Sequence, residues 1–262
     1  TWNANSSKSD ASYTWGKNAK DAAANLAMAK THFDDNTAGV QLTSNNAFLN
    51  GNEYRTPDYS KASGLHMIDF YMHHKFKDAG SAFSVADEED RYFNDATYNV
   101  TYVDSHDYGP NEGGYLYTRF SGGTQAWAGN FNLMFTFRGI PCVYYGSEVE
   151  FQKDMQIEPF TNGNKVPYAR SGRAYFGDHL EGTVTATDFS EYTASGTVAD
   201  TLNHELAQHV MRLNQIRRAV PALQKGQYSK DGCNGGVAFK RRFVDKEKGI
   251  ASFVLVAING SA

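Results

Sequence analysis

Cysteine, excess positive charge and long apolar runs are all scarce in this chain of 262 residues. The two cysteines, Cys142 and Cys233, are too few for a disulfide scaffold or an all-cysteine zinc site. Lys and Arg number 25 against 29 Asp and Glu, so the basic excess typical of a general nucleic-acid binder is missing. No apolar run approaches the length of a membrane-spanning helix. We therefore expect no nucleic-acid partner and no membrane span.

The composition is otherwise that of a globular protein, because 40% of the residues are hydrophobic and 21% are charged. Aromatic residues reach 14%, which suits a large core or a cleft lined with rings that stack on sugars or bases. Cys142 lies in an apolar run and is predicted to be a small buried side chain. Cys233 lies between Gly232 and Asn234 in a predicted turn, and no bridge between the two cysteines is expected.

Strands and helices alternate in the middle of the chain. Residues 98–103 are β-branched and aromatic and predict a strand, and residues 140–145 form a nearly continuous apolar run that predicts a strand buried on both faces. Between them a helix is expected from Thr124, as its N-cap, to Arg138, with Gly139 as the stop. Its buried face would carry Trp127, Phe131, Met134 and Phe135.

Further helices are predicted at residues 17–33, at 69–76 after a short apolar run, and at 201–218, where Leu202, Leu206, Val210 and Leu213 share one face and Pro221 closes the segment. Residues 1–16, 34–63 and 146–199 are predicted to be long polar loops. This alternation is typical of a parallel sheet or barrel, whose sites lie on the loops after the strands.

The last forty residues follow a different period. Val237, Phe239, Arg241 and Phe243 alternate with more polar neighbours, and a turn at 245–249 leads to a second strand at 253–258. We expect an antiparallel β domain that begins near residue 223. Asn259-Gly260 is a strong hairpin signal and predicts a further strand, so we expect the chain to end within that domain.

Two histidine pairs have ordinary explanations. His204 and His209 lie five residues apart, which puts them about 140° apart on a helix and not on one face, so a zinc-protease helix is disfavoured. His73 and His74 are adjacent and point apart on a helix, so they are expected to be core or surface residues and not metal ligands. By contrast, Asp104-Ser105-His106-Asp107 ends a predicted strand and precedes a Gly-rich loop, which is where a barrel places catalytic groups.

Two motifs resemble the α-amylase family of glycoside hydrolases. Residues 102–107, Tyr-Val-Asp-Ser-His-Asp, are similar to that family's FVDNHD segment, and residues 139–148, Gly-Ile-Pro-Cys-Val-Tyr-Tyr-Gly-Ser-Glu, are similar to its GIPxxYYGxE segment at the eighth barrel strand. The segment at 64–76, the helices around residues 125–138 and 204–221, and the closing hairpin also resemble the family's later elements in order. The resemblance covers most of residues 60–262.

The resemblance implies an α/β fold: the C-terminal half of a (β/α)8 barrel in residues 1–222, followed by the first strands of an antiparallel β-sandwich in 223–262. It implies that Asp107 stabilises the transition state and that His106 hydrogen-bonds the sugar. Tyr108 is expected to border the cleft, and the loop after the eighth strand offers further candidates for substrate binding, namely Asp154, Arg170, Arg173 and Asp178. Arg173 is the first choice for a sugar contact, and a salt bridge with Asp178 is the alternative.

The family's nucleophile and acid segments have no match here. Asp69, in Gly64-Leu-His-Met-Ile-Asp69, lacks the neighbouring Arg of the nucleophile segment and fits the sixth strand better, so it is not assigned as the nucleophile. A retaining glycosidase needs a pair of carboxylates about 5 Å apart. We therefore expect the chain to be part of a longer protein, with the other half of the barrel as its partner, and to be inactive alone.

The expected function is hydrolysis of starch-like α-glucans with retention. A transglycosylase of the same family and a non-catalytic domain that binds glycans or a partner protein are the alternatives. Calcium is possible from the resemblance, but its ligands cannot be located in this sequence. The Asn/Ser/Thr-rich loops, the few cysteines and the polymeric substrate favour an extracellular or cell-surface bacterial protein.

Overall fold

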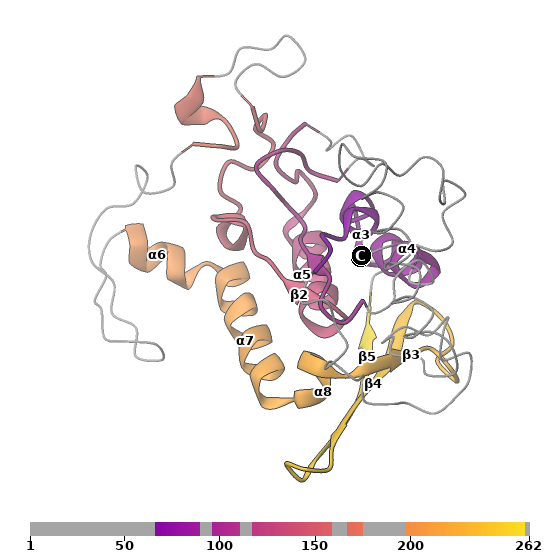
Figure 1. Ribbon diagram of the computed structural model, residues 1–262. Coiled ribbons are helices and arrows are strands. Elements are labelled where there is room, and N and C mark those ends of the chain that lie inside the picture. The colour runs from indigo at the N-terminus through magenta and orange to yellow at the C-terminus, as the bar shows by residue number, and fades with distance from the viewer. Residues whose placement is uncertain (1–65, 90–95, 111–116, 159–166, 175–196, 260–262) are drawn as a thin grey trace, which may run out of the picture.

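The computed structural model describes residues 66–89, 96–110, 117–158, 167–174 and 197–259. It is a mixed α/β structure that contains helices, a two-stranded parallel sheet and a three-stranded antiparallel sheet (Figure 1). The helices are α3 (Phe70–His74), α4 (Ala79–Glu89), α5 (Thr124–Thr136), α6 (Thr197–Asn203), α7 (Glu205–Ala219) and α8 (Pro221–Lys225). The strands are β1 (Val100–Thr101), β2 (Ile140–Pro141), β3 (Gln227–Ser229), β4 (Val237–Asp245) and β5 (Ile250–Ile258). The predictions for residues 1–16, 17–33 and 34–63 lie outside the described residues.

Three parallel segments lie side by side in chain order. Ile68 forms a parallel bridge with Val100, and β1 pairs with β2 through Val100↔Ile140 and Thr101↔Pro141. The segment between each pair contains helices, so this arrangement is that of successive βα units. It agrees with the predicted alternation of strands and helices.

The two predicted central strands are shorter than expected. Parallel pairing ends where the Cys142 amide donates to the carbonyl of Thr101, because both chains then leave the sheet to build the site segments. Burial on both faces was also a wrong prediction for 140–145, since Ile140 is 39% exposed. Cys142 is exposed as well, and not the buried side chain predicted for it. Ile140 and Cys142 are both exposed because no other element covers this face of the parallel segments in the described part of the chain.

Helix α5 supplies the centre of the core. Its predicted apolar face is confirmed, because Trp127, Phe131, Met134 and Phe135 are all buried. Its N-cap is Gly123 and not Thr124, whose hydroxyl donates instead to Glu150 Oε1 at 3.0 Å. The helix also ends at Thr136, before the predicted Arg138.

The end of α5 is stabilised by arginines from elements far along the chain. Arg217 of α7 donates to the carbonyl of Phe135 at 2.8 Å, and Arg241 of β4 donates to those of Thr136 and Phe137 at 2.9 and 2.6 Å. Cations favour the carbonyl end of a helix, where the last C=O groups have no partner within the helix. The two arginines therefore tie α7 and β4 to α5.

The predicted helix at 201–218 is two helices. His204 separates α6 from α7 and caps α7, because its Nδ1 accepts from the Leu206 amide at 3.2 Å. His209 makes a separate contact, at 2.7 Å from Asn132 Oδ1. Pro221 does not only close the segment: it is the first residue of α8.

The antiparallel sheet has the order β3-β4-β5, with β4 and β5 in register from Val237↔Ile258 to Asp245↔Ile250. The predicted alternation of β4 is confirmed, since Val237, Phe239, Arg241 and Phe243 are its buried residues. The hairpin formed by β4 and β5 projects away from the helices in Figure 1. Asn259 is the last described residue, so the further strand predicted after it lies outside the described part.

The strands also contribute to the core of the helices. Phe137, just after α5, makes edge contacts with Phe83, Tyr228 and Phe239, with ring centroids 5.2, 4.6 and 5.1 Å apart. Helix α8 spans the expected domain boundary at residues 222–223. The division into a barrel half and a β domain stays a prediction.

Asp69 is a structural residue in this fold. Its Oδ1 accepts from the Met72 amide at 3.0 Å and so caps α3, and its Oδ2 pairs with Arg138 Nη1 at 2.5 Å. Both side chains are completely buried. A carboxylate held in this way is not available as a nucleophile.

Candidate functional site

The segment Asp104 to Tyr108 leaves the end of β1 as a tight turn organised by Ser105. The Ser105 hydroxyl accepts from the amides of Asp107 and Tyr108 at 3.2 and 3.1 Å and donates to the carbonyl of Tyr108 at 2.7 Å. Serine hydroxyls stabilise turns by such local bonds. The turn leaves the side chains of His106 and Asp107 66% and 55% exposed and next to each other, with His106 Nε2 3.4 Å from Asp107 Oδ1.

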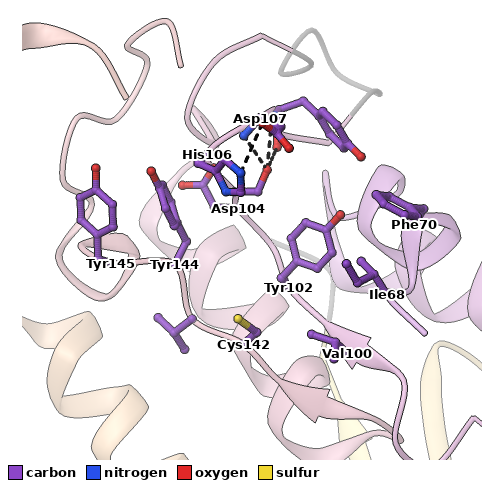
Figure 2. Close-up of a pocket in the computed structure, with 13 residues that line it drawn as sticks. Ile68, Phe70, Val100, Tyr102, Asp104, His106, Asp107, Cys142, Tyr144 and Tyr145 are labelled. Carbon is purple, nitrogen blue, oxygen red and sulfur yellow. Dashed lines mark hydrogen bonds and ion pairs between the residues drawn. The ribbon is translucent and has the colours of Figure 1, made fainter. Parts of the chain in front are cut away.

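These side chains border a pocket of about 300 Å³ at the open face of the parallel segments. In Figure 2, His106 and Asp107 lie at one end of the pocket, with Tyr144 and Tyr145 on one side and Phe70 on the other. The remaining lining residues include Ile68, Val100, Tyr102, Tyr108, Cys142 and Val143. The arrangement combines rings with a few polar groups, which is typical of a site for a small molecule.

Asp104 forms the buried support of the site. Its carboxylate is completely buried and accepts from Nε of Arg119, whose side chain is also completely buried. Burial raises the pKa of the Asp104 carboxyl, and the Arg119 guanidinium opposes that rise. Because its Oδ2 is held by Arg119, Asp104 orients the turn and is not a free acid or base.

Arg119 joins two other segments, residues 145–147 and Gly172, to that carboxylate. It donates to the carbonyls of Tyr145 and Gly172 at 3.2 and 3.3 Å and to the Ser147 hydroxyl at 3.0 Å. Its guanidinium carbon also lies 4.6 Å from the centre of the Tyr144 ring. An arginine can make several such bonds at once because its five donors lie in one plane.

A second arginine reaches the exposed end of the turn. Arg173 Nε donates to the carbonyl of His106 at 2.5 Å, and its Nη2 donates to Asp107 Oδ1 at 3.1 Å. The same Nη2 pairs with Glu158 Oε1 at 2.7 Å. Arg173 thus lies beside the pocket, in contact with the two residues that border it.

Histidine and tyrosine rings form the wall behind the site. Tyr102 stacks on His73 with ring centroids 4.1 Å apart, and His73 Nδ1 lies 3.2 Å from the Tyr102 carbonyl oxygen. Burial lowers the pKa of His73 to about 4. Burial also raises the pKa of the Tyr102 and Tyr144 hydroxyls, so both stay protonated and can donate hydrogen bonds.

The predicted site residues divide into three groups. His106, Asp107 and Tyr108 border the pocket, and Arg173 contacts the first two. Asp154 is exposed in a turn with a left-handed backbone, φ 66°, and is not among the residues that line this pocket. Asp178, and with it the alternative salt bridge to Arg173, lies outside the described residues.

Several groups of the site were not predicted from the sequence. Arg119 and Glu158 carried no local signal, since neither lies in a short motif of catalytic residue types. Tyr144 lies in the quoted segment 139–148 and could have been singled out as a ring at the end of a strand. Arg119 could have been suspected as a charge that a buried Asp104 requires.

Within the described ranges, the structure gathers no group of three or more His, Cys, Asp or Glu side chains that could hold a metal ion. None of the helices in these ranges is both long enough and apolar enough to cross a bilayer.

No protein-family model matches the chain, and no curated protein sequence matches it. Thirteen chains among the solved structures do match. One is an alpha-amylase from Anoxybacillus, whose crystal structure is described as giving insights into a new glycosyl hydrolase subclass. The similarity has a TM-score of 0.39 and 18% sequence identity and covers 68% of this chain. The matched part spans 33% of that enzyme's chain, about a third of its length.

Proposed function

We propose that this chain carries part of the active site of a glycoside hydrolase that acts on α-glucans with retention. The observation that carries the proposal is the turn at the end of β1, which holds His106 and Asp107 side by side on a pocket lined by aromatic rings. In a βα barrel, this end of a strand is the position of catalytic residues. Aromatic faces beside polar groups suit a sugar ring.

Asp107 is proposed to stabilise the positive charge that develops on the sugar ring in the transition state, and His106 to hydrogen-bond a hydroxyl of the same sugar. A fixed carboxylate at that place acts by electrostatic preorganisation. The exposed apolar side chains along the parallel segments, Ile68, Phe70 and Ile140, would be covered by the other strands of a complete barrel. We include that barrel in the proposal.

A retaining mechanism also needs a nucleophile and an acid about 5 Å apart. Two carboxylates line the pocket in the described part of the chain, and one of them, Asp104, is held by Arg119. The nucleophile and the acid are therefore proposed to lie outside the described residues. Whether water or a sugar hydroxyl resolves the intermediate, which separates a hydrolase from a transglycosylase, depends on those other parts.

A non-catalytic glycan-binding domain is the second candidate. It is favoured by the same scarcity of free carboxylates at the pocket, because binding a sugar needs the rings and the hydrogen-bonding groups but no carboxylate pair. The two candidates agree on the ligand and differ on turnover.

The first experiment is a titration of the 262-residue chain with maltoheptaose, followed by NMR. We expect shifts at the His106 ring and the Asp107 amide, and smaller ones with cellohexaose, which has the opposite linkage. The second is the Asp107→Asn change in a protein that contains this chain and degrades α-glucans. It should lower kcat by about a hundredfold or more with KM little changed, because the charge matters most in the transition state.

The matched control for Asp107→Asn is Asp154→Asn, which removes an exposed carboxylate away from the pocket. It should leave both kinetic constants unchanged. Sugar binding without turnover, in a longer protein with these residues intact, would favour the glycan-binding domain. Near-normal turnover of Asp107→Asn would contradict the assignment of Asp107.

A further inference from the structure

Arg173 contacts two residues of the site but is not itself among the described residues that line the pocket. Its guanidinium bonds the carbonyl of His106 and the carboxylate of Asp107, while the described residues that line the pocket do not include Arg173. Its side chain is 29% exposed. The guanidinium thus bonds two successive residues of the turn.

The backbone that carries Arg173 is itself anchored. The Gly172 amide donates to the carbonyl of Gln156 at 2.6 Å, and the Gly172 carbonyl accepts from Arg119. The Arg173 amide donates to the Ser171 hydroxyl at 3.2 Å. Arg119 also bonds Asp104 at the buried end of the turn, and Arg173 bonds His106 and Asp107 at its exposed end. The two arginines therefore hold the turn at both ends.

We propose that Arg173 is a positioning residue for Asp107 and His106. This proposal rests on the proposed function, because its first test measures the binding of a sugar. A planar fork can hold a carbonyl and a carboxylate in fixed relative positions, which a single ammonium group cannot do. Arg173 thereby sets the direction in which the Asp107 carboxylate faces the pocket.

Two other roles for Arg173 make different predictions. As a direct sugar ligand, it would contribute to affinity whether or not Asp107 is present. As an exposed ion pair of no functional weight, it would contribute almost nothing, as most surface pairs do. A double-mutant cycle with Asp107 separates these roles from positioning, because positioning acts only through the partner.

The test measures the affinity of the 262-residue chain for maltoheptaose in wild type, Arg173→Gln, Asp107→Ala and the double variant. We expect Arg173→Gln and Asp107→Ala each to weaken binding by about fivefold to tenfold, because alanine removes the hydrogen bonds of the carboxylate as well as its charge. The double variant should lose much less than the product of the two single losses, since contacting residues couple strongly. Arg173→Lys should recover less than half of the loss. Arg170→Gln is the matched control, because Arg170 is an exposed arginine of the same loop that is not among the residues lining the pocket, and it should bind like wild type.

If the double variant loses affinity by the product of the two single fold losses, the proposal is overturned in favour of a direct sugar contact. If Arg173→Gln binds like wild type, it is overturned in favour of an inert ion pair. A second measurement decides the case if the wild-type chain binds no maltoheptaose, which would count against the proposed function. The ¹⁵N relaxation of residues 106–108 should show increased fast motion in Arg173→Gln and none in Arg170→Gln. Equal order of this turn in both variants would refute positioning by Arg173.

Discussion

The buried His73 makes the protein less stable as the pH falls from about 6.5 to about 4. Its ring is fully buried against Tyr102, and burial lowers its pKa from 6.5 to about 4. The neighbouring His74 lowers it further, while the carbonyl of Tyr102 opposes the shift. The native state therefore keeps this imidazole neutral where the unfolded chain would already protonate it.

The sign follows from linkage. Above pH 6.5 neither state binds a proton at this site, so the full stability is present. As the pH falls below 6.5, His73 binds a proton in the unfolded state but stays neutral in the native state. Stability is therefore lost until the pH reaches about 4, where the native state also binds the proton. The whole shift is worth about 3 kcal/mol, of which about 2 kcal/mol is lost between pH 7 and pH 5.

The measurement is urea unfolding of wild type and His73→Phe at several pH values between 7 and 4. Phenylalanine keeps a flat ring against Tyr102 and cannot titrate, so the variant should lose about 2 kcal/mol less stability than wild type from pH 7 to pH 5. Comparing the two proteins cancels the carboxylates, which titrate in both. His66→Gln changes an exposed histidine and should follow wild type. Parallel stability curves for wild type and His73→Phe would refute the reasoning.

Three further changes test the packing around the site and the core by chemical denaturation. Gly172→Ala should lower the free energy of unfolding by about 1 to 3 kcal/mol, because the new Cβ would lie 2.9 Å from Arg119 Cγ. A loss under about 0.5 kcal/mol would show that this contact can relax. Gly129→Ala, inside α5 and with no atom within 4 Å of the new Cβ, should instead stabilise by about 0.5 to 1 kcal/mol; a loss would contradict it. Arg241→Met should cost about 3 kcal/mol or more, because it leaves three buried carbonyls without their donor, whereas Arg242→Met on the exposed face of β4 should cost little. Equal losses for these two arginines would argue against the buried cap.

Much of the local structure could be predicted from the sequence, because it depends on neighbours along the chain. The apolar face of α5 repeats with the helical period, and the buried residues of β4 alternate with the period of a strand. The turn at the end of β1 was found for the same reason, since it combines strand residues with a short run of polar ones. Helix α4 was missed because Gly80 and Ser81 weaken its pattern, although Asp78 accepts from the Ser81 amide at 2.7 Å as a cap does.

What only the tertiary structure decided are the contacts between residues far apart in the chain. Arg119 reaches Asp104 and two other segments, Arg173 reaches Asp107 across 66 positions, and Arg241 caps a helix more than 100 residues earlier. A charged side chain has no periodicity that tells which buried partner it will meet. The sequence by itself determined the apolar faces of α5 and β4 and which turn carries the polar pair. The fold alone decided that His106 and Asp107 border an aromatic pocket and that two arginines hold them there, because burial and charge pairing depend on which segments pack together.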